Sequence, residues 1–139
     1  MFLIDTNVIS EARKGARANP GVIAFFQKAA DRGDALFLSA ITVGELRRGV
    51  ELIRHRGEAQ QALNLESWLT GVLDFHRHHI LDFEVEAAQV WGMLRVPHAE
   101  HEIDKQIAAS ALVHDLTVVT GNTSDFAGTG VNLLNPFAA

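Results

Sequence analysis

The sequence predicts an α/β domain built on a mainly parallel central sheet of about five strands. Short apolar segments alternate along the chain with longer segments whose apolar residues recur at helical spacing. Strands that alternate with helices form parallel sheets, because each crossover helix covers a face of the sheet. The length of 139 residues and the hydrophobic fraction of 47% fit one globular domain over residues 1–139.

Local signals place the individual elements. Asn19 and Pro20 start a helix, since asparagine is a good N-cap and proline suits the first helical position. Gly33 ends that helix, and Pro97 ends a later one. In chain order we expect strands at 2–4, 35–39, 79–83, 116–120 and 131–134, and helices at 20–30, 42–57, 58–75, 84–96 and 104–114.

Composition excludes several classes of protein. The chain has no cysteine, so it has neither a disulfide framework nor a thiolate metal site. No apolar run approaches the roughly 20 residues that a membrane span needs. Asp5 follows the apolar residues 2–4 at once, which is unlike a secretory signal peptide. We therefore expect a cytoplasmic protein that does not contact a membrane.

The charge is unevenly distributed. The net charge of -5 argues against a simple basic nucleic-acid binder. Residues 1–56 nevertheless carry nine Lys or Arg against six Asp or Glu. For any single arginine, a solvated helix face is the simpler interpretation. A modest basic patch is the alternative, and its candidate phosphate contacts are Arg13, Lys14, Arg17, Arg47 and Arg48.

Acidic residues stand where predicted strands give way to loops or helices. The carboxyl ends of parallel strands line one crevice, so acids from separate segments would meet there. Clustered carboxylates repel one another, and they either raise their pKa values or hold a hard cation such as Mg²⁺. This pattern indicates a metal-dependent enzyme acting on phosphate esters. The residues are Asp5, Glu45, Asp104 and Asp125.

Each acid also has a purely structural interpretation. Asp5 could cap a following helix, and Asp125 could be a turn residue. Glu45 fits a capping box that begins at Thr42. Asp104 could be the N-cap of the helix that follows it. These separate roles leave the joint placement of the acids unexplained.

The histidines form two short groups without a recognised metal-binding spacing. With Glu100 and Glu102 nearby, they could suggest a zinc or transition-metal site, but surface or loop positions are the simpler interpretation. The groups are His76, His78 and His79, and then His98 and His101. The sequence contains no Gly-rich phosphate loop, Gly-x-Ser-x-Gly elbow or His-Glu-x-x-His helix.

Four segments in order resemble the PIN-domain family, specifically the VapC-type toxins of toxin–antitoxin pairs. The likeness extends over nearly the whole chain and is closest to the FitB-like branch at the N-terminus. It implies an α/β/α sandwich around a parallel sheet. The segments are 1–11 with Arg13 and Lys14, 39–46 with Gly49, 104–109 with Ala111 and Leu112, and 116–120 with Asn122, Asp125 and Phe126.

The resemblance also implies an activity and its residues. It implies an endoribonuclease that depends on Mg²⁺ or Mn²⁺ and uses a metal-activated water, leaving a 5′-phosphate and a 3′-hydroxyl. Asp5, Glu45 and Asp104 correspond to the central metal-binding acids, and Asp125 or Asn122 completes the set. Many relatives have a basic residue where this chain has Gly121. The groups implied to position substrate are Thr6, Asn7, Thr120 and Asn122.

Relatives usually dimerise and are held inactive by a cognate VapB-type antitoxin, often through an arginine aimed at the acids. The resemblance thus implies a homodimer, a larger toxin–antitoxin assembly, operator DNA bound only through the antitoxin, and RNA, with tRNA as a family-level candidate. Two other functions stay open. One is a different Mg²⁺-dependent α/β phosphohydrolase acting on a small phosphate ester or DNA. The other is a non-catalytic binding module, such as a degraded PIN domain.

Overall fold

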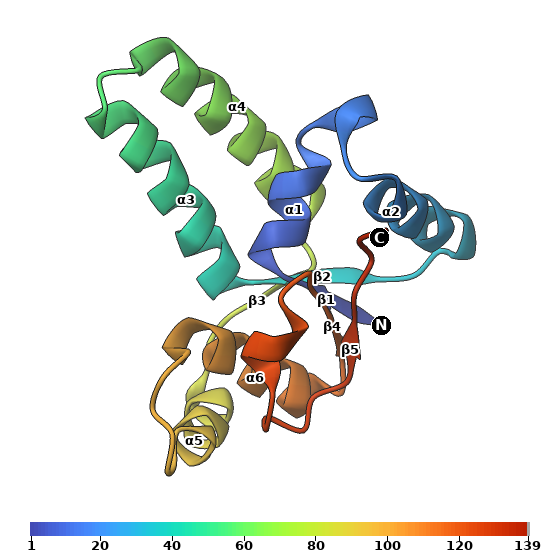
Figure 1. The fold of residues 1–139 in the computed structure, drawn as a ribbon, viewed down its shortest axis with the longest axis vertical. Helices are drawn as coiled ribbons and strands as arrows, with labels where there is room; N and C mark the ends of the chain where they lie inside the picture. Colours follow the sequence, from blue (N-terminus) through green and yellow to red (C-terminus); the bar gives the residue numbers. More distant parts are fainter. Residues whose placement is uncertain (139) are drawn as a thin grey trace.

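A parallel sheet forms the centre of the protein, whose computed structural model describes residues 1–138 (Figure 1). The strands lie in the order β3-β2-β1-β4-β5, and every neighbouring pair is parallel. This confirms the predicted α/β class and the sheet of about five strands. The strands are β1 (Phe2–Ile4), β2 (Leu36–Ser39), β3 (Ile80–Leu81), β4 (Thr117–Val119) and β5 (Leu133–Leu134).

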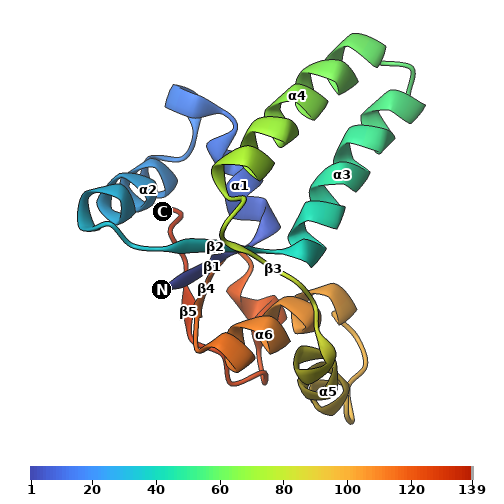
Figure 2. The ribbon, with the colours of Figure 1, turned by 180° about the vertical axis from the view of Figure 1, so that it is seen from behind.

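Helices cover both faces of the sheet, which makes the predicted three-layer sandwich. Figures 1 and 2 show α1 to α4 on one side and α5 and α6 on the other. The helices are α1 (Thr6–Ala12), α2 (Pro20–Arg32), α3 (Ala40–His55), α4 (Ala59–Phe75), α5 (Val85–Leu94) and α6 (Glu102–His114), with short 3₁₀ turns η1 (Gly15–Arg17) and η2 (Thr123–Phe126).

The strands are apolar throughout because both faces of the sheet are covered. Ile4 of β1 belongs to the core cluster that includes Val8 and Leu46, on the side of α1 to α4. Its neighbour Leu3 belongs to the opposite cluster, with Ile107 and Phe126. Successive side chains of β1 therefore pack on opposite faces of the sheet, and the strand is buried between the two helical layers.

The strand order determines where a ligand can bind. From β1 the chain runs to β2 and β3 on one side, and then it returns to β4 and β5 on the other. The direction of winding therefore changes between β1 and β4. In open α/β sheets, ligands bind in the crevice outside the carboxyl ends of the strands at this change of direction.

Helices α3 and α4 form a long hairpin that extends away from the sheet (Figures 1 and 2). Val50 of α3 and Leu69 of α4 are buried in the same core cluster. On its exposed side, Glu66 of α4 accepts hydrogen bonds from Arg47 and Arg54 of α3. Apolar packing and paired charges thus join the two helices.

One helix was missed, and several predicted boundaries differ from the structure by a few residues. The sequence predicted no element over residues 6–12, where α1 forms. Helix α3 begins at Ala40 rather than at Thr42, and α6 begins at Glu102 rather than at Asp104. Within residues 1–138, no helix combines the length and the apolar character needed to cross a membrane.

Candidate metal centre and active site

Asp5 stands at the carboxyl end of β1 and is 4% exposed. It is the N-cap of α1, which is one of the two structural roles, turn residue or helix cap, that the sequence left open for it. Its Oδ1 atom accepts the Thr6 N–H at 2.8 Å, and Oδ2 accepts Asn7 Nδ2 at 3.0 Å and the Thr120 hydroxyl at 2.8 Å. Burial raises the pKa of Asp5, whereas these three hydrogen bonds act to lower it.

Thr120 connects β4 to this carboxylate. While it donates to Asp5, its Oγ1 atom accepts hydrogen bonds from Asn7 Nδ2 at 3.1 Å and from the Asn122 N–H at 3.0 Å. A hydroxyl offers one donor and two acceptor sites, so all three are in use. Asn7 Oδ1 accepts the Gly121 N–H at 2.9 Å. The loops after β1 and β4 are thereby held together beside Asp5.

Glu45 lies in the second turn of α3 and is half-buried. The N-cap of α3 is Ser39, whose side chain accepts the Ile41 N–H at 3.0 Å. Thr42 is inside the helix, and its hydroxyl has no hydrogen-bond partner among residues 1–138. The capping-box interpretation of Glu45 was therefore wrong, because the Thr42 hydroxyl caps nothing. Glu45 lines the groove described below.

Asp104 occupies the first turn of α6. The N-cap position belongs to His101, so the interpretation of Asp104 as the N-cap was wrong. Burial, and then the negative charges of Asp5 and Asp125, raise the pKa of Asp104 from 3.8 to about 6; Glu45 adds a smaller effect, and His101 opposes it. The acids from separate segments therefore lie within electrostatic reach of one another.

A groove of about 320 Å³ opens at this edge of the sheet. Three of the four predicted acids line it, together with most of the predicted positioning residues. Apolar Ile103 and Ile107 form part of its wall. The polar lining residues are Asp5, Thr6, Asn7, Glu45, Asp104 and Asn122.

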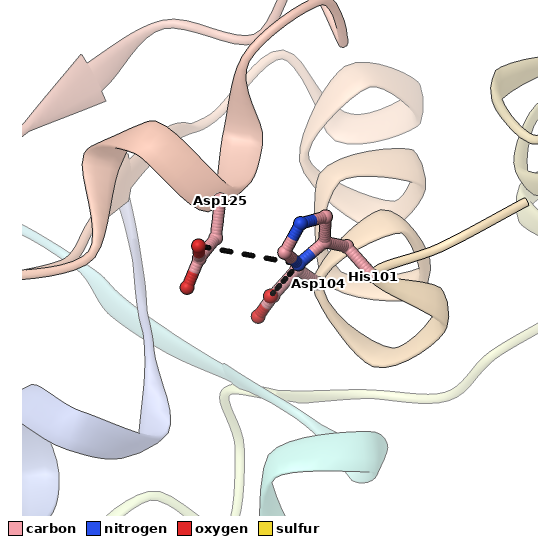
Figure 3. A group of neighbouring side chains, drawn as sticks. All are labelled: His101, Asp104 and Asp125. Atoms are coloured by element: carbon pink, nitrogen blue, oxygen red, sulfur yellow. Dashed lines mark ion pairs between the residues drawn. The ribbon is translucent and has the colours of Figure 1, made fainter. Parts of the chain in front are cut away.

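Asp125 and His101 extend the acid cluster beyond the groove. Asp125 lies in η2, and Figure 3 shows its carboxylate and that of Asp104 both facing the same nitrogen of the His101 imidazole. His101 Nδ1 is 3.7 Å from Asp104 Oδ2 and 3.9 Å from Asp125 Oδ1. These three side chains offer one metal-ligand atom each within 4.8 Å of one another.

The histidines do not all occupy the surface positions that the sequence suggested. His76 is buried, with Nδ1 3.3 Å from the Leu36 carbonyl oxygen, and burial lowers its pKa. His98 is exposed as expected. His101 is half-exposed but faces the acids, a relation that its spacing of three residues from Asp104 could have suggested.

The basic candidates fall into two kinds. Lys14 pairs with Glu11 at 2.9 Å, and Arg47 pairs with Glu66 at 2.6 Å. Among residues 1–138, Arg13 and Arg48 have no carboxylate within ion-pair distance. Their charges are therefore uncompensated and available to an anionic ligand.

Known proteins resemble this chain over its whole length. Toxin FitB of Neisseria gonorrhoeae is 36% identical over 99% of this chain and 99% of its own. The VapC ribonuclease Y4jK of Sinorhizobium fredii is 33% identical over 99% and 98% of the two chains.

Solved structures share the fold. The crystal structure of FitAcB from Neisseria gonorrhoeae superimposes with a TM-score of 0.82 at 34% identity, over 98% of both chains. The structure of FitAB bound to an IR36 DNA fragment gives a TM-score of 0.67 at 32% identity, over 100% of this chain and 97% of that one. The PIN domain family matches residues 2–131. This chain therefore belongs to the PIN domain family, among its FitB- and VapC-type toxins.

Proposed function

We propose that this protein is a divalent-metal-dependent endoribonuclease and the toxin of a VapBC-type toxin–antitoxin pair. The observation that carries the proposal is the convergence of Asp5, Glu45, Asp104 and Asp125 at the carboxyl edge of the sheet, where burial and then the negative charges of the other acids raise the pKa of Asp104 to about 6. The VapC ribonuclease relative supports the choice of RNA as substrate.

The donor set fits a hard divalent cation. Carboxylate oxygens are the ligands that Mg²⁺ and Mn²⁺ prefer. Asp5 lines the groove, and its Oδ1 atom accepts a single hydrogen bond from the described residues, so this oxygen keeps an unused lone pair. A cation would also neutralise the repulsion that raises the pKa of Asp104. We assign the metal to Asp5, Glu45, Asp104 and Asp125.

The side chains of this site have distinct roles in the proposed reaction. A bound Mg²⁺ or Mn²⁺ lowers the pKa of its water and neutralises charge on the scissile phosphate. Thr120 and Asn7 hold the Asp5 carboxylate in one orientation. Asn7, Thr6 and Asn122 line the groove, where they can orient the phosphodiester. Hydrolysis by water needs no nucleophilic side chain, and it leaves a 5′-phosphate and a 3′-hydroxyl.

Single-stranded or loop RNA suits this groove, because a flexible phosphodiester can bend toward the acids. Arg13 and Arg48 provide the uncompensated positive charge. Lys14 and Arg47 can contribute only by exchanging their carboxylate partners for phosphate. We place this activity in the cytoplasm, where RNA is available.

We further propose that a VapB-type antitoxin covers the groove, and that the toxin forms a homodimer within a larger assembly. The solved structure of FitAB with DNA supports this assignment. Operator DNA would then be bound through the antitoxin. Size-exclusion chromatography with light scattering, on the toxin alone and with its antitoxin, measures both assembly steps.

The test compares the wild type with Asp5→Asn in EDTA, Mg²⁺ and Mn²⁺. We expect cleavage of single-stranded RNA only with metal, and a metal-induced rise in melting temperature, since a ligand at a hundred times its Kd stabilises the folded state by about 2.7 kcal/mol. Both effects should disappear in Asp5→Asn. Asp31→Asn, at an exposed position in α2, is the matched control and should behave as the wild type.

Two results would contradict the proposal. Undiminished cleavage by Asp5→Asn would remove Asp5 from the site. Turnover of a generic phosphomonoester without RNA cleavage would instead favour a different phosphohydrolase of the same fold class.

A further inference from the structure

The imidazole of His101 lies close enough to the acid cluster to supply a nitrogen ligand to a metal ion. Its Nδ1 atom lies 3.7 Å from Asp104 Oδ2 and 3.9 Å from Asp125 Oδ1 (Figure 3). Two ligands of one ion with bonds of about 2.1 Å lie roughly 3.0 to 4.2 Å apart, depending on whether they are adjacent or opposite. Both distances fall in this range, so a single ion can contact the imidazole and either carboxylate with little movement.

The loop that carries His101 is held from both neighbouring helices. Lys105 of α6 is buried and donates through Nζ to the His98 carbonyl, while its N–H donates to the His101 carbonyl at 2.9 Å. From α5, Trp91 Nε1 donates to the Glu102 carbonyl at 3.1 Å. The position of His101 is therefore fixed by the fold.

The backbone at His101 is left-handed, with φ 59° and ψ 46°. This conformation is unfavourable for a residue with a Cβ and therefore carries an energetic cost. His101 makes no side-chain capping bond to α6 that would offset this cost. The conformation turns the imidazole toward Asp104 and Asp125, as Figure 3 shows.

We propose that His101 supplies a nitrogen ligand to the metal ion held by Asp104 and Asp125, so that the site prefers a first-row transition ion such as Mn²⁺ to Mg²⁺. The proposal rests on the metal-dependent function proposed above. Mg²⁺ takes oxygen ligands almost exclusively, whereas imidazole binds first-row transition ions well. A mixed donor set therefore raises affinity for the transition ion more than for Mg²⁺.

The experiment is pulsed electron paramagnetic resonance of Mn²⁺ bound to the full chain, which detects a directly coordinated ¹⁴N nucleus. It is paired with calorimetric titration of Mn²⁺ and Mg²⁺. The test variant is His101→Asn, because asparagine tolerates the left-handed backbone. The matched control is His98→Asn, on the same loop, where His98 is 76% exposed and lies beside Glu100. Thermal melting in EDTA verifies that both variants fold.

We expect ¹⁴N coupling in the wild type and in His98→Asn, and its loss in His101→Asn. The ratio of Mn²⁺ to Mg²⁺ affinity should fall about tenfold in His101→Asn alone, the lower end of the effect of losing a group that tunes a metal site. Mn²⁺ binding that depends on Asp5 but shows no ¹⁴N coupling, or coupling that survives in His101→Asn, would overturn this inference and leave the nuclease function standing. Failure of Mn²⁺ to bind at all would overturn both.

Discussion

The hydroxyl of Thr120 holds the Asp5 carboxylate in place. A substitution by valine, which has nearly the same shape as threonine, tests this role. Thr120→Val keeps the buried volume but removes the donor to Asp5 Oδ2 and the acceptor for Asn7 and Asn122. Loss of a group that orients a metal ligand typically lowers metal affinity 10- to 100-fold. We expect a loss of that size in Thr120→Val by calorimetric titration, with a matching loss of RNA cleavage.

Thr120→Ser is the control for this prediction, because it keeps the hydroxyl and removes only a methyl group. It should retain most of the metal affinity. Equal, near-native affinity in both variants would show that Asp5 is oriented by Thr6 and Asn7 alone.

Asp104 makes the metal-free protein sensitive to pH. Its folded pKa of about 6 lies above the ordinary 3.8, so the folded state binds the proton more tightly than the unfolded state. The free energy of unfolding should therefore fall as pH rises from about 4 to about 6. A shift of this size corresponds to about 3 kcal/mol, which solvent screening reduces to about 1–2 kcal/mol.

The neutral variant Asp104→Asn removes this penalty. In EDTA at pH 7.5 it should be more stable than the wild type by about 1–2 kcal/mol, whereas at about pH 3.5, below the unfolded pKa of 3.8, the two should nearly coincide. Urea unfolding at the two pH values measures the difference. A variant less stable than the wild type at pH 7.5 would show that the Asp104 carboxylate makes a net stabilising contact.

At the scale of elements, the sequence predicted the strands and the long helices but missed the short helix α1. The strands are marked by short, wholly apolar runs and the long helices by apolar residues at helical spacing, and both were placed within a few residues. Helix α1 has seven residues, and its polar start at Asp5 looks like a turn. It forms because Asp5 caps it and because Val8 and Ile9 are buried. Whether such a short helix forms depends mainly on tertiary packing, because a helix of this length is not stable on its own.

The caps of the helices that carry Glu45 and Asp104 were also predicted wrongly, because local sequence does not determine where each helix begins. The capping box predicted Thr42 as the cap of α3, whereas in the fold the cap is Ser39, which the sequence had placed in a strand. The grouping of Asp5, Glu45 and Asp125 could be predicted because each comes soon after a strand, whereas Asp104 comes after α5 and joins them through the first turn of α6. The inclusion of His101 was not predicted, because its spacing of three residues from Asp104 is only a weak signal and its orientation depends on a loop conformation fixed by Lys105 and Trp91.

The C-terminal segment depends on a glycine at the start of α2. A Cβ added to Gly21 would lie 2.1 Å from the Pro136 carbonyl oxygen and 2.6 Å from the Ala138 nitrogen. Asn19 Oδ1 accepts the N–H groups of both Gly21 and Ala138, so the segment lies directly on the helix N-terminus. Gly21→Ala should displace it and destabilise the protein by about 1–3 kcal/mol in urea unfolding.

Gly71→Ala provides the comparison. Gly71 is inside α4 with nothing within 4 Å of an added Cβ. Alanine there should stabilise the protein by about 0.5–1 kcal/mol, because glycine loses more backbone freedom in a helix. If Gly21→Ala also stabilised the protein, the close contact with Pro136 would not exist in solution.

At the scale of the whole molecule, the proposed activity requires a chain of net charge -5 to hold RNA beside its own acids. Binding must then depend on a few local cations rather than on the total charge. Arg13 follows α1 at its C-terminal end, and Arg48 lies one helical turn after Glu45 on α3. For single-stranded nucleic acid, each phosphate contact contributes about 0.7 to the slope of log affinity against log salt.

We therefore expect Arg13→Gln and Arg48→Gln each to reduce this slope by about 0.7, measured by fluorescence anisotropy with single-stranded RNA. The Asp104→Asn background prevents cleavage during the titration and removes one repelling charge. Lys28→Gln is the control, because Lys28 lines a pocket with Phe2 and Asp34 at the opposite edge of the sheet. An equal change in slope for Lys28→Gln would mean that RNA binds through the general field of the molecule, and the groove would then lose its role in substrate binding.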